Sequence, residues 1–334
     1  MSINVQSDNC VLTDKEITST YTYNTQRAEE RADGGYDVTP TSHEYTFKTQ
    51  RRVPKVGVMI VGWGGNNGTT LTAGLLANKH NITWETNDGT QHPNYYGSLT
   101  QSSTLRLGMN ADGKEVFAPF KNILPMVDPS DIVVGGWDIS GVNMFDAMRR
   151  SKVLDYDLQL RLARHMRYST PLASIYYPDF IASNQKDRAN NVLNGDDKMA
   201  HLNIIRKDIS TFKAENGLDK VIVLWSASTE RFMDVQEGVH DTAENLFNAI
   251  ENSHPEVAPS VIFAMAACME GCSYINGSPQ NTLVPGLIEM AKISRVFVGG
   301  DDFKSGQTKM KSVLVDFLVS AGIKPVSIAS YNHL

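Results

Sequence analysis

Apart from Trp63, the segment Gly62-Trp63-Gly64-Gly65-Asn66-Asn67-Gly68-Thr69-Thr70 consists of glycine, asparagine and threonine. It directly follows the apolar run Val56–Val61 and directly precedes the helical pattern Leu71–Asn78. Glycines allow a tight turn and a close approach of the backbone to a pyrophosphate, whose charge is then met by the N–H groups at the start of the helix. The segment predicts a dinucleotide site, and the alternative is a strand-to-helix turn without a ligand.

The glycine spacing departs from the G-x-G-x-x-G pattern. Gly62 and Gly64 match it, but Asn67 occupies the place of the third glycine and Gly68 follows one position later. The acid that usually binds the ribose about 20 residues further on is also indistinct. Glu85 is the candidate at that distance.

Polar residues also follow other predicted strands, where a doubly wound sheet binds its ligands. Asp138, after Gly135-Gly136-Trp137, could accept ribose hydroxyls or could cap the next helix. The hydroxyl-rich segment Ser226–Arg231 could cap a helix or line a cofactor groove. The polar loop Tyr274–Thr282 could contribute to the same site or could simply be solvated.

The segment Gly299–Lys309 leads into an amphipathic helical pattern. Ser305–Thr308 fall where the N–H groups of a helix start are free, and Lys304, Lys309 and Lys311 are near them in the sequence, which predicts a phosphate site. The alternative is a capped helix with surface lysines. Adjacent residues on extended backbone point to opposite sides, so only one of Asp301 and Asp302 is expected to face a site.

The elements that would position these groups alternate between strand and helix, which predicts an α/β fold with a doubly wound, mostly parallel, Rossmann-like sheet. The clearest helical stripe joins Met310, Val313, Leu314, Phe317, Leu318 and Ala321, and we expect it to pack in the core. Further helices are expected at Asn203–Glu215 and Thr242–Ile250, and a long loop at Ser183–Lys198. Buried strands are predicted at Val56–Val61, Ile132–Val134, Val221–Trp225, Val261–Ala264, Val296–Val298 and Val326–Ala329.

The first fifty residues differ in texture from the rest of the chain. Tyr21 and Tyr23, and then Tyr45 and Phe47, alternate with polar residues, as in half-buried strands. We therefore predict an N-terminal arm with short peripheral strands over residues 1–52 and a dinucleotide-binding unit over residues 53–334.

Composition excludes several classes of protein. Of the 334 residues 41 % are hydrophobic, which is ordinary for a globular chain. The net charge of −6 argues against binding of nucleic acid or of an anionic membrane surface. Residues Met1–Thr25 contain no apolar signal segment, and no run approaches a membrane span, so a cytoplasmic protein is expected. Cys268 and Cys272 are interpreted as buried thiols near the end of a strand rather than a metal or redox pair, and no metal site is predicted.

Several of these motifs, in this order, closely resemble eukaryotic myo-inositol-1-phosphate synthases (inositol-3-phosphate synthases). The resemblance extends from Asp37–Thr41 to the last residue, Leu334. It is carried by Gly64–Gly68, Pro93–Ser98, Gly136–Ile139, Ser174–Ile181, Ile275–Thr282 and Gly300–Thr308.

The resemblance implies an NAD-dependent, redox-neutral isomerase. In this family glucose 6-phosphate is oxidised at C5, enolised, closed by an intramolecular aldol step and reduced again to inositol 3-phosphate. The family is homotetrameric, and its catalytic lysines come mainly from a second α+β domain. We expect that domain to lie beyond Leu334 and so to be absent from these 334 residues.

The chain alone is then expected to show little synthase activity. The alternatives are a non-catalytic NAD-binding subunit of a longer synthase and an NAD dehydrogenase of a sugar phosphate.

The resemblance also assigns individual residues. Asp302 is the catalytic candidate, and the candidates for the substrate phosphate are Ser305, Gly306, Gln307 and Thr308. Arg188 could pair with the pyrophosphate. The implied NAD-binding residues are Gly64, Gly65, Asn66, Asn67, Asp138, Ser174, Gln185, Arg188, Ser226, Ala227, Ser228, Thr229, Gly277, Ser278, Asp302 and Ser305.

Overall fold

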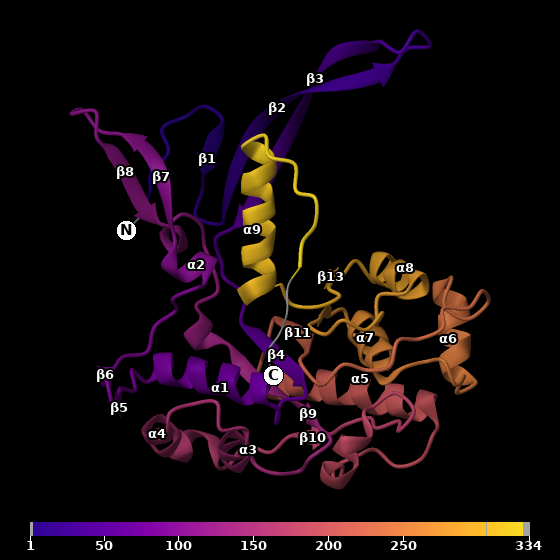
Figure 1. The fold of residues 1–334 in the computed structure, drawn as a ribbon. Coiled ribbons are helices and arrows are strands. Elements are labelled where there is room, and N and C mark those ends of the chain that lie inside the picture. Colours follow the sequence, from indigo (N-terminus) through magenta and orange to yellow (C-terminus); the bar gives the residue numbers. More distant parts are fainter. Residues whose placement is uncertain (1–2, 305, 330–334) are drawn as a thin grey trace.

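A parallel β-sheet forms the centre of the computed structural model, which describes residues 3–304 and 306–329 (Figure 1). Within these residues the sheet has six strands in the order β10-β9-β4-β11-β12-β13. The strands are β4 (Val56–Val61), β9 (Val133–Asp138), β10 (Leu172–Ala173), β11 (Lys220–Trp225), β12 (Ser273–Asn276) and β13 (Val298–Gly299). Numbered by their appearance in the chain, they run 3-2-1-4-5-6, the order of a doubly wound dinucleotide-binding sheet. The predicted fold class is confirmed.

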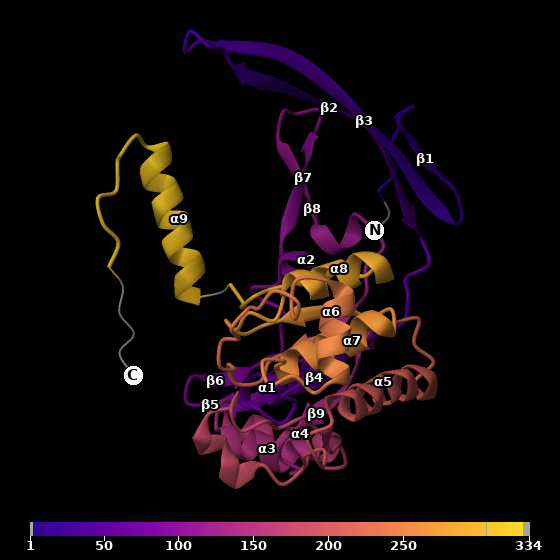
Figure 2. The same cartoon turned by 90° about the vertical axis from the view of Figure 1, so that its right-hand side faces the viewer.

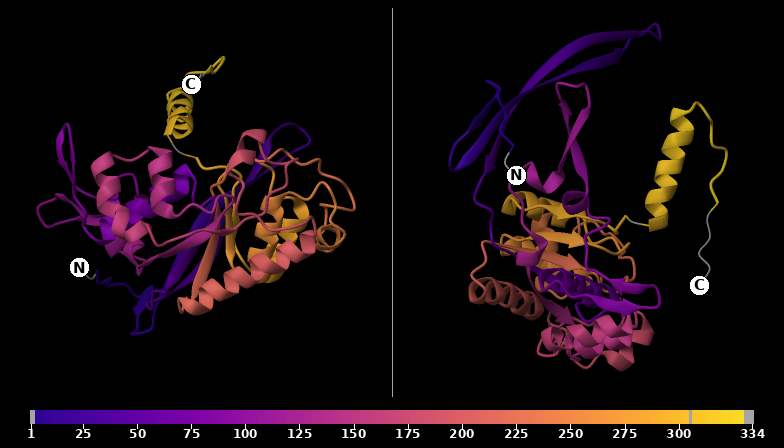
Figure 3. Two further views of the ribbon diagram at one scale, coloured as in Figure 1. Left: turned by 90° about the horizontal axis from the view of Figure 1, so that it is seen from below. Right: turned by 90° about the vertical axis from the view of Figure 1, so that its left-hand side faces the viewer.

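Helices cover both faces of the sheet, because side chains in the central strand alternate between two apolar clusters. Ile60 packs with one cluster, while Met59 and Val61 pack with the other. The first cluster is covered by α1 (Asn66–Lys79), α3 (Met144–Ser151) and α4 (Tyr156–Met166). The second is covered by α5 (Lys198–Glu215), α6 (Ala243–Glu251), α7 (Pro259–Met269) and α8 (Pro285–Ser294) (Figure 3).

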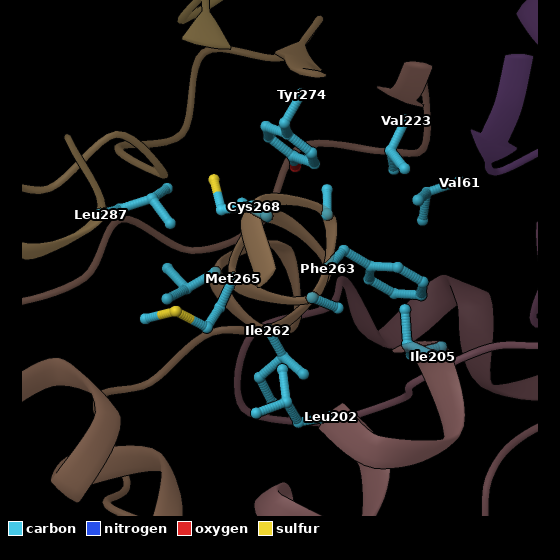
Figure 4. Packing of buried hydrophobic residues seen from close by; sticks show 14 of the residues in the cluster. Val61, Leu202, Ile205, Val223, Ile262, Phe263, Met265, Cys268, Tyr274 and Leu287 are labelled. Carbon is cyan, nitrogen blue, oxygen red and sulfur yellow. The ribbon is translucent and has the colours of Figure 1, made fainter. Parts of the chain in front are cut away.

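Helix α7 corrects one prediction. Val261–Ala264, expected to be a strand, belongs to α7, whose residues from Pro259 to Cys268 are all buried. Phe263 contacts both Trp137 and Trp225, with ring centroids 5.1 and 6.1 Å away. Figure 4 shows Phe263 on α7 among other buried apolar side chains. A helix buried all round has the same continuous apolar sequence as a buried strand, so hydropathy alone does not separate the two.

The two thiols are buried, as predicted, but Cys268 lies in α7 and not near the end of a strand. Burial raises the pKa of Cys268 to about 12 and that of Cys272 to about 11, so neither is a reactive thiolate near neutral pH.

An excursion of about 50 residues separates α1 from β9. It contains two hairpins, two short 3₁₀ turns and one short helix. They are β5 (Trp84–Thr86), β6 (Gly89–Gln91), α2 (Leu99–Ser102), β7 (Thr104–Met109), β8 (Glu115–Pro119), Phe120–Asn122 and Pro129–Asp131. In an undecorated fold of this type α1 would lead almost directly into the second strand.

The N-terminal residues form a separate antiparallel sheet of β1 (Cys10–Leu12), β2 (Glu16–Glu30) and β3 (Tyr36–Gln50). Strands were predicted here, but β2 and β3 have 15 residues each and are not short. They pair residue by residue from Glu16 with Gln50 to Glu30 with Tyr36. Figure 2 shows this hairpin arching away from the parallel sheet.

Helix α9 (Gly306–Ser320) confirms the predicted helical pattern, but not its predicted burial. Met310, Val313, Leu314 and Phe317 are all more than half exposed. The helix stands apart from the sheet and its covering helices (Figure 2). Val326–Ala329, predicted to be a strand, has no regular structure.

Two smaller predictions also change. The expected loop Ser183–Lys198 begins with a 3₁₀ turn, Ser183–Arg188, and ends at the start of α5. The expected strand Val296–Val298 shifts to Val298–Gly299. No helix in the described part of the chain is long and apolar enough to cross a membrane.

Candidate functional site

A cavity of about 380 Å³ opens at the carboxyl edge of the sheet, where β4, β9, β10 and β11 end. This is the position at which a sheet of this order binds its ligand. The cavity is lined by Val61, Gly62, Gly65, Asn66, Asn67, Asp138, Ile139, Ser174, Ile175, Ile181, Gln185, Arg188, Trp225, Ser226, Ala227 and Ser228.

The glycine-rich turn after β4 is shaped by close backbone contacts. Gly62 has a φ of +85°, and a Cβ there would lie 2.6 Å from the Cα of Ala227. A Cβ on Gly68 would lie 2.2 Å from the carbonyl oxygen of Trp63. Gly68 therefore allows α1 to pack closely against the preceding turn, which is the role of the third glycine in the usual pattern. The one-residue displacement seen in the sequence leaves that role intact.

The N-terminus of α1 suits an anion. Gly65 is its N-cap, so no side chain caps the helix, and the first turn contains no acidic residue. Asn66 and Asn67, the first residues of the helix, line the cavity. Their N–H groups are those that a helix leaves without an intrahelical acceptor. A phosphate at this end would be favoured by these groups and by the helix dipole.

Asp138 and Arg188, which also line the cavity, form an ion pair. The Asp138 side chain is 3 % exposed, and its Oδ1 lies 2.9 Å from Nη2 of Arg188. The same Oδ1 accepts a hydrogen bond from Ser140 N at 2.9 Å. Asp138 does not cap α3, whose N-cap is Asn143. Nε of Arg188 is buried and has no acceptor among the described residues.

Asp138 occupies the place in the fold where a ribose-binding acid is expected, although it is far from the usual distance along the sequence. Asp138 ends β9, the second strand of the sheet, which is where that acid is expected. The excursion between α1 and β9 moves it far from the glycine turn along the chain. Glu85, at the usual distance, lies in β5 and accepts a hydrogen bond from Thr90 on the neighbouring strand. It does not line the cavity.

Arg150 is part of this neighbourhood, and sequence reasoning missed it. Its Nη2 donates to the carbonyl oxygen of Gly64 at 2.7 Å. Burial and the positive charge of Arg188 lower the pKa of Arg150, while the negative charge of Asp138 raises it. Arg150 lies in the last turn of α3, where basic residues are common, so nothing in the sequence distinguished it.

The end of β11 forms the third wall. Ser226 N donates to the carbonyl oxygen of Val61 at 2.9 Å, which ties this wall to the glycine turn. Ser278 Oγ donates to the carbonyl oxygen of Ala227 at 2.9 Å. Gly277 lies against the ring of Phe303 and the carbonyl oxygen of Trp225. Gly277 and Ser278 thus support the wall from behind without lining the cavity.

The polar loop after β12 is not merely solvated, because its polar side chains alternate inward. Asn276, Gln280 and Thr282 are all at most 2 % exposed. Asn276 Nδ2 donates to the carbonyl oxygen of Gln280 at 3.1 Å, and Thr282 Oγ1 bonds Ser260 Oγ at 2.8 Å. The loop is a hydrogen-bonded support for the neighbouring strand ends.

Asp301 and Asp302 do point differently, but the backbone there is bent and not extended. Asp301 Oδ1 accepts a hydrogen bond from Asn276 Nδ2 at 2.6 Å, and burial raises the pKa of Asp301. Asp302 is exposed, and its Oδ1 accepts from Phe303 N at 2.8 Å. Its own N–H donates to the carbonyl oxygen of Asn276 at 3.2 Å.

The structure brings together most of the predicted cofactor residues and leaves others apart. Gly64, Thr229, Gly277, Ser278 and Asp302 do not line the cavity, although Gly64, Gly277 and Ser278 contact residues that do. The predicted residues that line the cavity are Gly65, Asn66, Asn67, Asp138, Ser174, Gln185, Arg188, Ser226, Ala227 and Ser228.

Two predictions concern residues near the end of the sequence. Ser305 lies outside the described residues, and so does Leu334, beyond which the catalytic lysines of the family are expected. Of the other phosphate candidates, Gly306, Gln307 and Thr308 begin α9. The position of the family lysines therefore stays a prediction.

Sequence reasoning did not assign the apolar walls to the site. Val61, Ile139, Ile175, Ile181 and Trp225 lie within or beside the quoted motifs, but buried apolar residues carry no chemical signal of their own. Over residues 3–304 and 306–329, no group of three or more His, Cys, Asp and Glu side chains is arranged to hold a metal ion.

Comparison with known proteins shows the family of the chain and agrees with its fold. Residues 56–329 match the model of an NAD-binding domain family described as Myo-inositol-1-phosphate synthase. The chain is 56 % identical to the inositol-3-phosphate synthase of Saccharomyces cerevisiae, with all of this chain and 64 % of that protein aligned. It is also 56 % identical to the Dictyostelium discoideum enzyme, again over the whole chain and 65 % of the relative.

A crystal structure of inositol-3-phosphate synthase from Caenorhabditis elegans has the same fold. It superposes with a TM-score of 0.94 and 52 % identity, covering 96 % of this chain and 63 % of that one. The chain thus spans about two thirds of the length of these relatives. The family model, the sequence identity and the fold agree, and the chain belongs to the myo-inositol-1-phosphate synthase family.

Proposed function

We propose that the cavity binds NAD through the ends of four strands. The residues present fit this cofactor in three respects. The uncapped N-terminus of α1 suits the pyrophosphate, the Asp138 carboxylate suits the ribose hydroxyls, and the buried Nε of Arg188 is a donor that lacks an acceptor among the described residues. The observation that carries the proposal is the buried Asp138–Arg188 pair at the end of the second strand.

We propose that the protein makes inositol 3-phosphate, the product that the names of its relatives state for them, and that it does so from glucose 6-phosphate, the substrate that the family resemblance implies. When bound, NAD would accept a hydride from the substrate and later return it. The residues described here serve by holding the dinucleotide through several separate contacts. Ser226 and Ser228 supply polar groups to the cavity lining, and Ile175, Ile181 and Trp225 supply apolar ones. Such a site suits a reaction in which the cofactor must not dissociate between two hydride transfers.

For the substrate, we propose the binding residues that the family resemblance implies. Its phosphate would lie at the start of α9, with Ser305, Gly306, Gln307 and Thr308, and Asp302 would contact the reacting sugar. Support comes from the first turn of α9, which has no acidic residue, and from the hydrogen bond that fixes Asp302 N beside β12. We further propose a domain boundary near residues 52–53 and a cytoplasmic homotetramer, on the strength of the family resemblance.

Two measurements test the proposed function. Calorimetry should detect NAD binding to the chain, and weaker binding to Arg188→Gln. With a protein that also carries the family's second α+β domain, phosphorus NMR should detect inositol 3-phosphate formed from glucose 6-phosphate without net NADH at 340 nm.

NADH accumulating with turnover would instead indicate a sugar-phosphate dehydrogenase. NAD binding without turnover, together with co-purification of a longer synthase, would indicate a binding subunit. Absence of NAD binding would contradict the proposal.

A further inference from the structure

Three charged side chains lie around the end of β9 and Gly64, and their charges do not balance. Arg188 pairs with the Asp138 carboxylate at 2.9 Å, and the Arg150 guanidinium bonds the carbonyl oxygen of Gly64, the residue beside the other carboxylate oxygen of Asp138. One negative charge therefore faces two positive charges beside the cavity. Removing the carboxylate would leave two neighbouring cations with no counter-charge from this cluster.

One oxygen of the Asp138 carboxylate accepts no hydrogen bond from the described residues. Among the described residues, Oδ1 of Asp138 accepts the hydrogen bonds from Arg188 and Ser140, and Oδ2 accepts none. Oδ2 lies beside Gly64, where a Cβ would approach it to 3.2 Å. An ionised carboxylate only accepts hydrogen bonds, so Oδ2 suits a hydroxyl donor and repels a phosphate. The second strand of a dinucleotide sheet presents its acid to the ribose 2′-OH, which in NADP carries a phosphate.

We propose that Arg150 and Arg188 form a latent site for a 2′-phosphate, and that the Asp138 carboxylate masks this site from the place where dinucleotide sheets usually carry their ribose-binding acid. The inference rests on the proposed NAD site. Arg150 has a second, positioning role, because its bond to the carbonyl oxygen of Gly64 ties the glycine turn to α3. Both arginines are already in place, so a change at Asp138 alone should alter the preference.

The test is the affinity for two probes that differ only in the 2′-phosphate, 5′-ADP and 2′,5′-ADP, together with NAD and NADP, by calorimetry. The wild-type chain should prefer NAD and 5′-ADP. Asp138→Asn should weaken NAD binding by roughly 10- to 100-fold, the effect of losing a hydrogen bond to a charged group. It should also strengthen binding of 2′,5′-ADP and NADP by at least about ten-fold, as expected for new charge-assisted bonds.

Two further variants separate the roles. Adding Arg150→Gln to Asp138→Asn should remove most of the gain for 2′,5′-ADP. Arg149→Gln is the matched control, because Arg149 is the neighbouring arginine of α3 and its guanidinium lies over the Phe145 ring at 5.9 Å. It should leave all four affinities unchanged.

The outcomes distinguish this inference from the proposed function. A wild-type chain that binds neither NAD nor NADP contradicts both. A wild-type chain that binds NAD, combined with an Asp138→Asn variant that keeps the same preference, contradicts only the inference. Should Asp138→Asn not fold, Arg150→Gln alone decides. Its ratio of NADP to NAD dissociation constants should exceed that of the wild type, and an unchanged ratio would contradict the latent site.

Discussion

Gly68 and Gly74 lie in the same helix but in different surroundings. A Cβ on Gly68 would collide with the backbone of Trp63, whereas a Cβ on Gly74 would meet nothing within 4 Å. We expect Gly68→Ala to lower the free energy of unfolding by about 1–3 kcal/mol and to weaken NAD binding, because the turn must move. Gly74→Ala should raise the free energy of unfolding by about 0.5–1 kcal/mol, since alanine is the better helix former. Urea denaturation of both variants measures the difference, and equal effects would refute this account of the turn.

Glu230 should make stability depend on pH. Its carboxyl is buried and accepts a hydrogen bond from Ser260 N at 3.1 Å, and burial raises its pKa to about 8 from an ordinary 4.5. Between these values the folded chain keeps a proton that the unfolded chain releases. The free energy of unfolding should therefore fall as pH rises from about 4.5 to 8.

Glu230→Gln removes the titrating group and keeps an acceptor for Ser260. Denaturation midpoints measured from pH 5 to 8 should fall less steeply in this variant than in the wild type. Glu251→Gln, at an exposed position of α6, is the control and should retain the wild-type slope. Parallel slopes for wild type and Glu230→Gln would show that Glu230 is ionised in the folded chain.

At the scale of elements, α7 connects the core to the site. Phe263 packs against Trp137 and Trp225, and the residues that follow these tryptophans, Asp138 and Ser226, line the cavity. Phe263→Ala should lower the free energy of unfolding by about 3–5 kcal/mol and should weaken NAD binding. Phe232→Ala is the control, because Phe232 is 64 % exposed, and it should change stability by at most about 0.5 kcal/mol. A small effect of Phe263→Ala on urea denaturation would contradict the central position of α7.

The sequence predicts an element correctly where its pattern of residues is compatible with only one kind of structure. The apolar run of β4, the glycine turn and the start of α1 were recognised together, because a short buried strand and a polar helix start look different. The run in α7 was assigned to a strand because a helix without a polar face loses the helical period. The stripe of α9 was correctly periodic, but periodicity cannot say whether an apolar face is covered.

Most of the cavity-lining polar residues were likewise predictable, since strand ends are marked by glycine, serine and aspartate. Arg150 was not, because its role depends on a contact with Gly64 that only the folded chain creates. The usual spacing from the glycine turn points to Glu85 and not to Asp138, because the excursion between α1 and β9 lengthens the sequence between the turn and the second strand.

At the scale of the whole molecule, the N-terminal hairpin and the parallel sheet should differ in local stability. Tyr21, Tyr23, Tyr45 and Phe47 in the hairpin are about half exposed, whereas Met59 and Val223 in the central strands are fully buried. Backbone amides of β2 and β3 should therefore exchange hydrogen through local opening, and those of β4 and β11 only through much larger unfolding events. Hydrogen-exchange mass spectrometry of the chain measures both sets at once. Equal protection of the hairpin and the central strands would contradict this separation.

The order of the strands also affects how the chain folds while the ribosome synthesises it. The central strand β4 pairs on one side with β11, so that Val56 meets Lys220, about 160 residues further along the chain. At a synthesis rate of 5–20 residues per second, the ribosome needs roughly 8–30 s to supply that partner. During this interval the growing chain has a strand rich in valine and isoleucine, with both sides unpaired until β9 is made and one side unpaired after that. This nascent stage, and not the finished sheet, is where a chaperone would have the most apolar surface to protect.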